Sequence, residues 1–345
     1  MKYIDVRSDT VTLPKKEMLE TIMDAQLGDD IQGEDPTVKK LEEKAAEILG
    51  KESALLVTSG TMGNQIAIMT YCGRGEEIIL GEDSHIYTLE GAASAAVAQV
   101  QSRVMPVKNG IYDVSVMESL INKGDLQRPK TSLICLENTY NLNAGEIIPL
   151  ENLKEIRKLA DNHDLPIFLD GARIFNASVE MGIDPAILCA EVDSVQFCLT
   201  KGLGSPVGSI LAGSKDFIEA ARLNKQRLGG GMRQAGIIAA PAIYALDYMI
   251  DRLKEDNTRA QWLGDALSKL NYLEVHEVAT NIVSPLLTHP EQDASQLIDF
   301  LLTKSIKVKH IGEKQVRIII HHQVTDEDLH HIVDAFKEFT TEIRL

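Results

Sequence analysis

Apolar runs of strand length alternate with segments of helical periodicity from about residue 54 to residue 215. This alternation restricts the fold more than any other feature of the sequence. The apolar runs lie at residues 54–57, 77–80, 131–136, 165–169 and 194–199. Strands that alternate with helices are typical of a mostly parallel sheet covered by helices on both faces. The sequence therefore predicts an α/β large domain which, together with an N-terminal arm, spans residues 1–245.

A second pattern follows toward the C-terminus. A long helical region near 234–270 is expected to lead out of the large domain. Strands near 281–287 and 315–320 and helices near 293–303 and 326–342 then predict a smaller α+β domain, which we place at residues 246–345. A chain of 345 residues with 44% hydrophobic residues is long enough to build a core in each of two domains.

Two of the apolar runs end in groups of opposite charge. The run 165–169 leads to Asp170, and the run 194–199 leads to Lys201 and a glycine-rich turn. Taken singly, an aspartate like Asp170 is more often a cap or turn residue, and a lysine like Lys201 is more often a solvated loop charge. Ligands of open α/β sheets, however, bind beyond the carboxyl ends of the strands. An amine that forms an imine with an aldehyde and a carboxylate that keeps a pyridine nitrogen protonated together favour pyridoxal 5'-phosphate as the cofactor.

Two glycine-containing segments are candidate phosphate sites. Residues 58–65 form a turn of small residues between a strand and a helix, where free backbone N–H groups and the helix dipole bind anions. A plain tight turn is the alternative there, and the phosphate of the predicted cofactor favours the anion site. The glycines 229–231 lie between Arg227 and Arg233 and suit a backbone that approaches a phosphate, including that of a neighbouring subunit. A flexible surface loop explains this second segment equally well.

Three further features bear on the site. His85 follows the strand 77–80, where an imidazole can stack on a cofactor ring or act as an acid or base, although a lone histidine is more often structural. Arg317 lies inside the predicted strand 315–320, and a buried cation needs an anionic partner. A substrate carboxylate and a structural salt bridge satisfy that need equally. Residues 7–12 hold too many hydroxyls and charges for a core strand and predict an arm that covers another part of the molecule.

Composition excludes several other classes of protein. The net charge of −16 argues against a nucleic-acid partner. No apolar run approaches the ~18 residues of a membrane span, and the first residues lack the apolar core of a signal peptide. The four cysteines lie in apolar or scattered contexts without metal-ligand spacing, and they are interpreted as small buried residues of a protein in a reducing compartment. They are Cys72, Cys135, Cys189 and Cys198. We therefore expect a cytoplasmic protein that acts on a small molecule, without nucleic-acid or membrane partners.

These motifs resemble those of the low-specificity L-threonine aldolases, pyridoxal-phosphate enzymes of the aspartate-aminotransferase fold type, fold type I. The matching segments span nearly the whole chain in the family's order: residues 5–12, 33–36, 59–64, 83–85, 170–176, 198–203 and 229–234. The resemblance implies an aldolase that cleaves L-threonine, L-allo-threonine and other β-hydroxy-α-amino acids to glycine and an aldehyde. It also implies a role in amino acid metabolism as a source of glycine, and a homotetramer with active sites at subunit interfaces.

The resemblance also implies a role for each matching residue. Lys201 would form the imine, Asp170 would face the pyridine nitrogen, and His85 would stack on the ring with Glu90 near the reacting centre. Phosphate and cofactor contacts would come from Ser59, Gly60, Thr61, Arg173, Arg227 and Arg233. The substrate would be held by Ser8, Arg173, Arg317 and Tyr140. No metal is expected in the active site, and the family type implies at most a structural cation near Thr10 and Thr12.

This chain departs from the family pattern at two positions. Many members have a histidine after Glu-Asn-Thr where this chain has Tyr140, and some have an aromatic residue in place of Leu89. Both differences bear on the preference for threo or allo substrates. The base at the β-hydroxyl is either His85 itself or a water that His85 and Glu90 hold. A β-eliminating lyase, an amino-acid racemase and a non-catalytic relative that binds the cofactor are the alternative functions.

Overall fold

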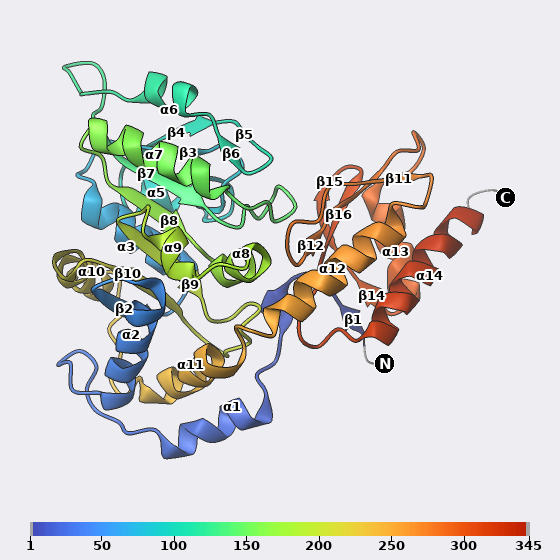
Figure 1. Ribbon diagram of the computed structural model, residues 1–345, viewed down its shortest axis with the longest axis horizontal. Helices are drawn as coiled ribbons and strands as arrows, with labels where there is room; N and C mark the ends of the chain where they lie inside the picture. The colour runs from blue at the N-terminus through green and yellow to red at the C-terminus, as the bar shows by residue number, and fades with distance from the viewer. Residues whose placement is uncertain (1–2, 343–345) are drawn as a thin grey trace.

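The computed structural model describes residues 3–342, and it divides them into a large and a small domain (Figure 1). The large domain is built on a seven-stranded sheet, and the small domain has its own sheet of five strands. The α/β architecture predicted from the sequence is therefore confirmed. In the part of the chain that the model describes, no helix is long and apolar enough to cross a membrane.

The central sheet is parallel except for one strand. Its order is β2 (Ser53–Val57), β10 (Ser209–Gly213), β9 (Ser194–Cys198), β8 (Ile167–Asp170), β7 (Thr131–Glu137), β3 (Glu77–Gly81) and β4 (Gln101–Met105). Only β10 runs antiparallel to its neighbours. Because β7, β8 and β9 are parallel and adjacent, the residues that follow them lie together at one edge of the sheet.

Alternating side chains of the strands enter two separate cores. In β2, Leu55 and Val57 belong to the core under α3 (Gly60–Tyr71) and α10 (Lys215–Arg227), whereas Leu56 belongs to the core on the other face. That second core is covered by α2 (Pro36–Leu49), α7 (Leu150–Asn162), α8 (Ile174–Met181) and α11 (Gly236–Tyr248). Since successive side chains of a strand point to opposite faces, strands with helices on both sides are apolar throughout.

Short elements complete the large domain. They are η1 (Asp9–Val11), α1 (Lys16–Glu20), η2 (Thr21–Asp24), α4 (His85–Thr88), α5 (Ala93–Ala96), β5 (Val107–Lys108), β6 (Ile111–Tyr112), α6 (Val114–Leu120) and α9 (Pro185–Cys189). Helix α5 is only one turn long. Helix α1 gives way to η2 at Thr21, where the backbone tightens to a 3-10 helix.

The small domain packs a sheet against helices. It contains α12 (Leu253–Leu267), β11 (Leu273–Val275), β12 (Ile282–Val283), β13 (Pro285–Leu287), α13 (Ala294–Thr303), β14 (Ile306–Lys307), β15 (Lys309–Gly312), β16 (Gln315–Ile319) and α14 (Asp326–Glu342). The helical region predicted near 234–270 consists of two helices, because the chain turns between Tyr248 and Leu253. The domain boundary at residue 245 stays a prediction, and it lies within α11.

The N-terminal arm joins the small domain first and then reaches the large one. Its strand β1 (Ile4–Asp5) pairs in parallel with β14. The Val6 carbonyl accepts a hydrogen bond from the Ile319 N–H at 2.9 Å, and the Val6 side chain is buried in the small-domain core. The next residues form η1, which brings the arm to the edge where the strands of the central sheet end. The predicted role as a covering arm fits this path.

Candidate active site

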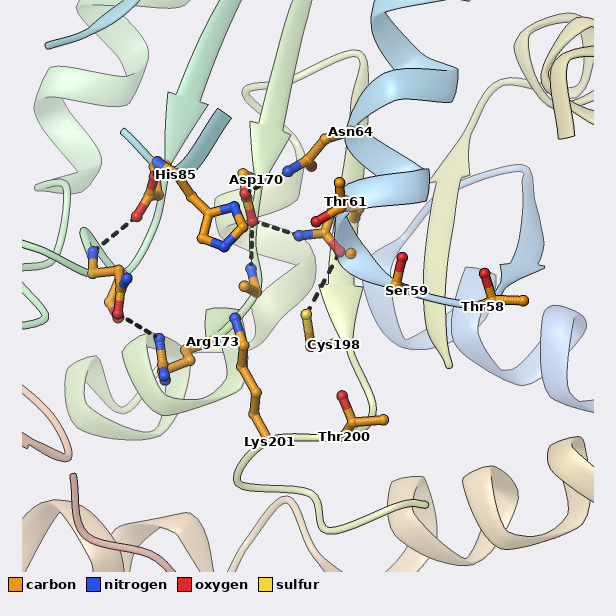
Figure 2. A pocket seen from close by; sticks show the side chains of 16 residues that line it. Thr58, Ser59, Thr61, Asn64, His85, Asp170, Arg173, Cys198, Thr200 and Lys201 are labelled. Carbon is orange, nitrogen blue, oxygen red and sulfur yellow. Dashed lines mark hydrogen bonds between the residues drawn. The ribbon is translucent and has the colours of Figure 1, made fainter. Parts of the chain in front are cut away.

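A pocket opens at the carboxyl ends of the parallel strands (Figure 2). It holds about 620 Å³ of space outside the protein atoms, part of it open to solvent. The residues after β3, β7, β8 and β9 line it, together with the start of α3. Asp170, Lys201 and His85, which are widely separated in the sequence, all lie in its wall. The structure therefore brings the central residues of the predicted site together.

Asp170 ends β8, and three hydrogen-bond donors hold its carboxylate. Oδ2 accepts from Asn64 Nδ2 at 2.8 Å, and Oδ1 accepts from the Ala172 N–H at 3.1 Å and from the side-chain amide of Gln196. The residue is only 2% exposed. Donors on both oxygens offset the cost of burying the charge. The carboxylate is thus fixed in orientation before any ligand binds.

Lys201 follows β9 and extends from its loop into the pocket, toward the side of Asp170 (Figure 2). The turn that carries it is closed by a hydrogen bond from the Gly204 N–H to the Lys201 carbonyl at 2.8 Å. Within residues 3–342, the Lys201 ammonium has no ion pair or hydrogen bond to a side chain. An amine held in a pocket without a partner is suited to bind a carbonyl compound covalently.

His85 begins α4 and is oriented by two carboxylates. Its Nδ1 lies 2.9 Å from Oε1 of Glu90, and its backbone N–H donates to Oε2 of Glu137 at 2.6 Å. Burial disfavours the charged imidazole, but the hydrogen bond to Glu90 and the charge of Asp170 outweigh it. The pKa of His85 is therefore raised above its ordinary value.

Glu90 is buried behind His85 rather than in the pocket wall. It accepts hydrogen bonds from Asn64 Nδ2 at 2.7 Å and from Gln65 Nε2 at 2.8 Å. Asn64 therefore donates to both Glu90 and Asp170, and it links the two carboxylates. Glu90, predicted near the reacting centre, contacts His85 and does not line the pocket itself.

The start of α3 forms another wall of the pocket. Ser59 caps this helix, and its Oγ accepts from the Met62 N–H at 3.1 Å. Gly60 and Thr61 are the first two helical residues, so their N–H groups have no acceptor within the helix. A Cβ on Gly60 would lie 2.9 Å from Cys198 Sγ, so any other residue there would force Cys198 to shift. The geometry suits an anion at the helix N-terminus.

Two buried arginines lie at the edge of the pocket. Arg173 donates from Nε and Nη2 to the two carboxylate oxygens of Asp9, each at 2.7 Å. Arg317 Nη1 donates to Asn141 Oδ1 at 2.7 Å, and the same oxygen accepts from Arg173 Nη1 at 3.3 Å. Burial and the charge of Arg173 lower the pKa of Arg317 to about 10. The structure thus offers a cationic subsite beside the pocket.

Comparisons with known proteins agree with this geometry. Residues 5–288 match the family model described as beta-eliminating lyase. A probable low-specificity L-threonine aldolase of Arabidopsis thaliana is 39% identical over 98% of this chain and 97% of that protein. The low specificity L-threonine aldolase of Escherichia coli is 37% identical over 97% of this chain and 99% of that protein. The chain belongs to the low-specificity L-threonine aldolase family.

The solved structure of a threonine aldolase shares the fold of this chain. The Leishmania major threonine aldolase has a TM-score of 0.83 and 19% identity, over 97% of this chain and 99% of that one. The donors in the pocket also fit pyridoxal 5'-phosphate: a carboxylate for the pyridine nitrogen, an amine for the aldehyde and a helix N-terminus for the phosphate. The predicted resemblance to the low-specificity L-threonine aldolases is therefore confirmed. The prediction of pyridoxal 5'-phosphate as the cofactor is confirmed for the family.

Five predicted contact residues do not line this pocket in the described chain; Arg317 lies beside it, bonded to the lining residue Asn141, and the other four have different surroundings. Tyr140 is fully buried, and its hydroxyl accepts a hydrogen bond from the Asp83 N–H at 3.2 Å. Its ring packs on Gly81 and lies edge-on to Tyr112, so it does not point at the ligand space. Ser8 caps η1, where its Oγ accepts from the Thr10 N–H at 3.2 Å. The neighbouring residue Asp9, and not Ser8, pairs with Arg173.

The other two are the arginines that flank the glycines 229–231. Arg227 donates to Asn224 on its own helix at 3.0 Å, and Arg233 donates to Asp29 at 2.6 Å. Neither lines the pocket, although the glycines between them approach the first turn of α3, where a Cβ on Gly230 would lie 2.8 Å from Met62 Sδ. The structural cation near Thr10 and Thr12 stays a prediction. Thr10 Oγ1 donates to Ser8 Oγ at 2.9 Å and Thr12 Oγ1 to the Asp9 carbonyl at 2.8 Å.

The sequence did not identify the residues that make hydrogen bonds to the predicted site residues. These are Asp9, Asn64, Glu137, Asn141 and Gln196. Burial and the charge of Asp170 raise the pKa of Glu137 to about 7. The Glu137 carboxylate joins two parts of the site, because it accepts from the N–H of His85 and, at 2.8 Å, from that of Asn141. Glu137 directly follows an apolar run, as Asp170 does, and that signal could have identified it.

Proposed function

We propose that this protein is a pyridoxal-phosphate-dependent aldolase that cleaves the Cα–Cβ bond of L-threonine, L-allo-threonine and related β-hydroxy-α-amino acids. The products are glycine and an aldehyde, which is acetaldehyde for threonine. The observation that carries this proposal is the meeting of Asp170 and Lys201 in one pocket with two buried arginines at its edge. The names of the relatives support the same reaction.

The pocket residues divide the binding of the cofactor among them. Asp170 would face the pyridine nitrogen, His85 would cover the ring, and Lys201 would hold the aldehyde carbon. Ser59, Gly60 and Thr61 would bind the phosphate through the start of α3. When bound, pyridoxal phosphate supplies an electron-withdrawing ring that accepts the electron pair of a broken Cα bond.

The arginines decide which bond breaks. A carboxylate bound at Arg317 and Arg173 fixes the rotation of the substrate about its Cα–N bond. Only the Cα bond that stands perpendicular to the ring plane is broken, so the position of the carboxylate selects Cα–Cβ cleavage. Correct orientation of this kind can contribute ~7–11 kcal/mol to the lowering of a barrier.

Cleavage also requires removal of the proton from the β-hydroxyl oxygen. His85 takes this proton, either directly or through a water that it holds. Glu90 keeps the imidazole in place through Nδ1, so Nε2 is the ring nitrogen that remains for the substrate. Because the pKa of His85 is raised, the neutral form that can accept a proton increases only at higher pH.

Other copies of the chain complete the site. Arg227 and Arg233 do not line the pocket of their own chain, and we propose that they contact the phosphate in a neighbouring subunit of a homotetramer. A cytoplasmic enzyme that supplies glycine is the physiological role that we propose. Neither the assembly nor the location changes the roles assigned above to Asp170 and Lys201.

A β-eliminating lyase is the second candidate, because the matching family model carries that description. The test is to incubate purified protein and added pyridoxal phosphate with L-threonine, L-allo-threonine, L-serine and D-threonine. Our proposal predicts glycine and acetaldehyde in equal amounts from the first two substrates. Formation of 2-oxobutanoate and ammonia from threonine would instead identify β-elimination, and formation of D-allo-threonine from L-threonine, by inversion at Cα alone, would identify a racemase.

A further inference from the structure

Four side chains from separate parts of the fold meet beside the pocket. Asp9 comes from η1 of the arm, Arg173 from the start of α8, Arg317 from β16 of the small domain, and Asn141 from the loop after β7. All are at most 9% exposed, and Asp9 is completely buried. This cluster therefore joins the arm, the large domain and the small domain at one point.

The charges in this cluster are not balanced. One carboxylate, that of Asp9, faces two guanidinium groups. It is bidentate to Arg173, whereas Arg317 is bonded only to the neutral amide of Asn141. The buried Nε of Arg317 has no hydrogen-bond acceptor among the described residues. A buried cation without an anion is costly, so the cluster is complete only when one further carboxylate binds.

Asp9 is itself held firmly. It is the first residue of η1, and its Oδ2 accepts a further hydrogen bond from Asn281 Nδ2 at 3.4 Å. The arm before it is fixed to the small domain through β1 and β14. The Arg173 guanidinium lowers the pKa of Asp9 well below its usual range despite burial. Asp9 thus occupies the Nε–Nη2 edge of Arg173 as a permanent anion.

We propose that Asp9 is a positioning residue for the substrate carboxylate, an inference that rests on the proposed aldolase function. By occupying one edge of Arg173, Asp9 leaves Nη1 directed at Asn141, next to Arg317. The substrate carboxylate then has one position, at Arg317 beside Nη1 of Arg173, in place of two competing positions on two free guanidinium groups. A single carboxylate position fixes which Cα bond is broken.

The first test follows two fates of L-threonine on the holoenzyme in deuterated water. Cα–Cβ cleavage releases acetaldehyde. Breakage of the Cα–H bond, followed by return of a deuteron from the solvent, leaves threonine labelled at Cα. We expect Asp9→Asn to lower kcat for cleavage by ~10- to 100-fold, because a misplaced carboxylate misaligns the bond. The ratio of labelled threonine to acetaldehyde should rise at least ~threefold.

A structural defect alone would give a different result. Loss of folded holoenzyme lowers both rates together and leaves their ratio unchanged, so an unchanged ratio would overturn the proposal. Asp5→Asn is the matched control, because Asp5 lies in the same arm and pairs with the exposed Arg7 at 2.6 Å. We expect it to keep the wild-type ratio. A wild-type protein that cleaves no β-hydroxy amino acid would refute the proposed function and not the role of Asp9.

The second test uses the apoprotein and needs no activity. In Asp9→Ala, added formate can occupy the Nε–Nη2 edge of Arg173 in place of the missing carboxylate. We expect sodium formate to raise the Tm of Asp9→Ala more than that of the wild type or of Asp5→Ala, with sodium chloride as the ionic-strength control. Equal shifts in all three proteins would show that Asp9 does not hold Arg173, and would overturn the proposal.

Discussion

His85 Nδ1 lies 2.9 Å from Glu90 Oε1, and this contact sets both the orientation and the charge of the imidazole. Glu90 cannot turn away, because Asn64 and Gln65 each donate a hydrogen bond to it. The negative charges of Glu90 and Asp170 raise the pKa of His85 against the effect of burial. The reactivity of His85 therefore depends on a residue that does not line the pocket.

Glu90→Gln should shift the pH dependence of cleavage. Loss of the negative charge removes part of the stabilisation of the imidazolium, so the pKa of His85 falls. Because the neutral imidazole takes the proton, the acidic limb of the kcat/KM profile moves to lower pH by the same amount. The same pKa can be measured on the apoprotein from the NMR signals of the His85 ring. An unchanged limb would show that His85 is not the group that titrates.

The pH dependence of stability gives an independent check of this contact. A histidine with a raised pKa in the folded state stabilises the fold fully at pH values below its unfolded pKa of ~6.5, and loses this contribution as the pH rises through the folded pKa. We expect the difference in free energy of unfolding between wild type and Glu90→Gln to be larger at pH 5.5 than at pH 9. Urea denaturation of the apoproteins measures it, and equal differences would contradict the assigned protonation.

Gly60→Ala tests the anion site at the start of α3. The new Cβ would lie 2.9 Å from Cys198 Sγ and 3.3 Å from Gln196 Oε1, and Gln196 supports Asp170. We expect the Kd for pyridoxal phosphate to rise at least ~tenfold, because overpacking of this size costs ~1–3 kcal/mol. Absorbance titration of the apoprotein measures the Kd.

Gly63→Ala is the matched control for that substitution. Gly63 lies on the same helix, but its new Cβ would approach no closer than 3.4 Å, to Gln196 Cβ. Its Kd should stay close to that of the wild type. If both variants bind the cofactor equally well, close packing at Gly60 is not needed for the phosphate.

Tyr140→Phe tests whether this residue contacts the substrate. The hydroxyl accepts from the Asp83 N–H in a buried position, so its loss should reduce stability by ~1 kcal/mol. The ratio of activities on L-threonine and L-allo-threonine should stay the same, because the ring packs on Gly81 outside the pocket. A changed ratio would restore the role that the sequence predicted for Tyr140.

The sequence identifies the charged groups of the site more readily than the groups that orient them. Asp170 and Lys201 are detectable because each follows an apolar strand, and parallel strands bring such positions together. Asn64 is different, because its position within a helix gives no sign that it links Asp170 to Glu90. Asp9 is hidden for another reason: its partner Arg173 lies 164 residues away in the sequence, and only the path of the arm brings them together.

Local patterns also fail where packing decides the direction of a side chain. The position of Tyr140 after Glu-Asn-Thr predicts a substrate contact, but the loop turns the ring beneath the end of β3. The helical periodicity over 234–270 continues across the turn at residues 249–252, because both helices supply apolar faces to adjoining cores. Periodicity reports which side of a helix is buried, and it does not report where one helix gives way to the next.

The most direct test of the central assignment compares wild type with Lys201→Ala in the presence of pyridoxal phosphate and L-threonine. Glycine and acetaldehyde are quantified in the same reaction. We expect equal amounts of the two products from the wild type, and a decrease of at least ~10³-fold in the variant, because the lysine acts together with the rest of the site. Wild-type cleavage rates in Lys201→Ala, or formation of 2-oxobutanoate and ammonia by the wild type, would contradict the account.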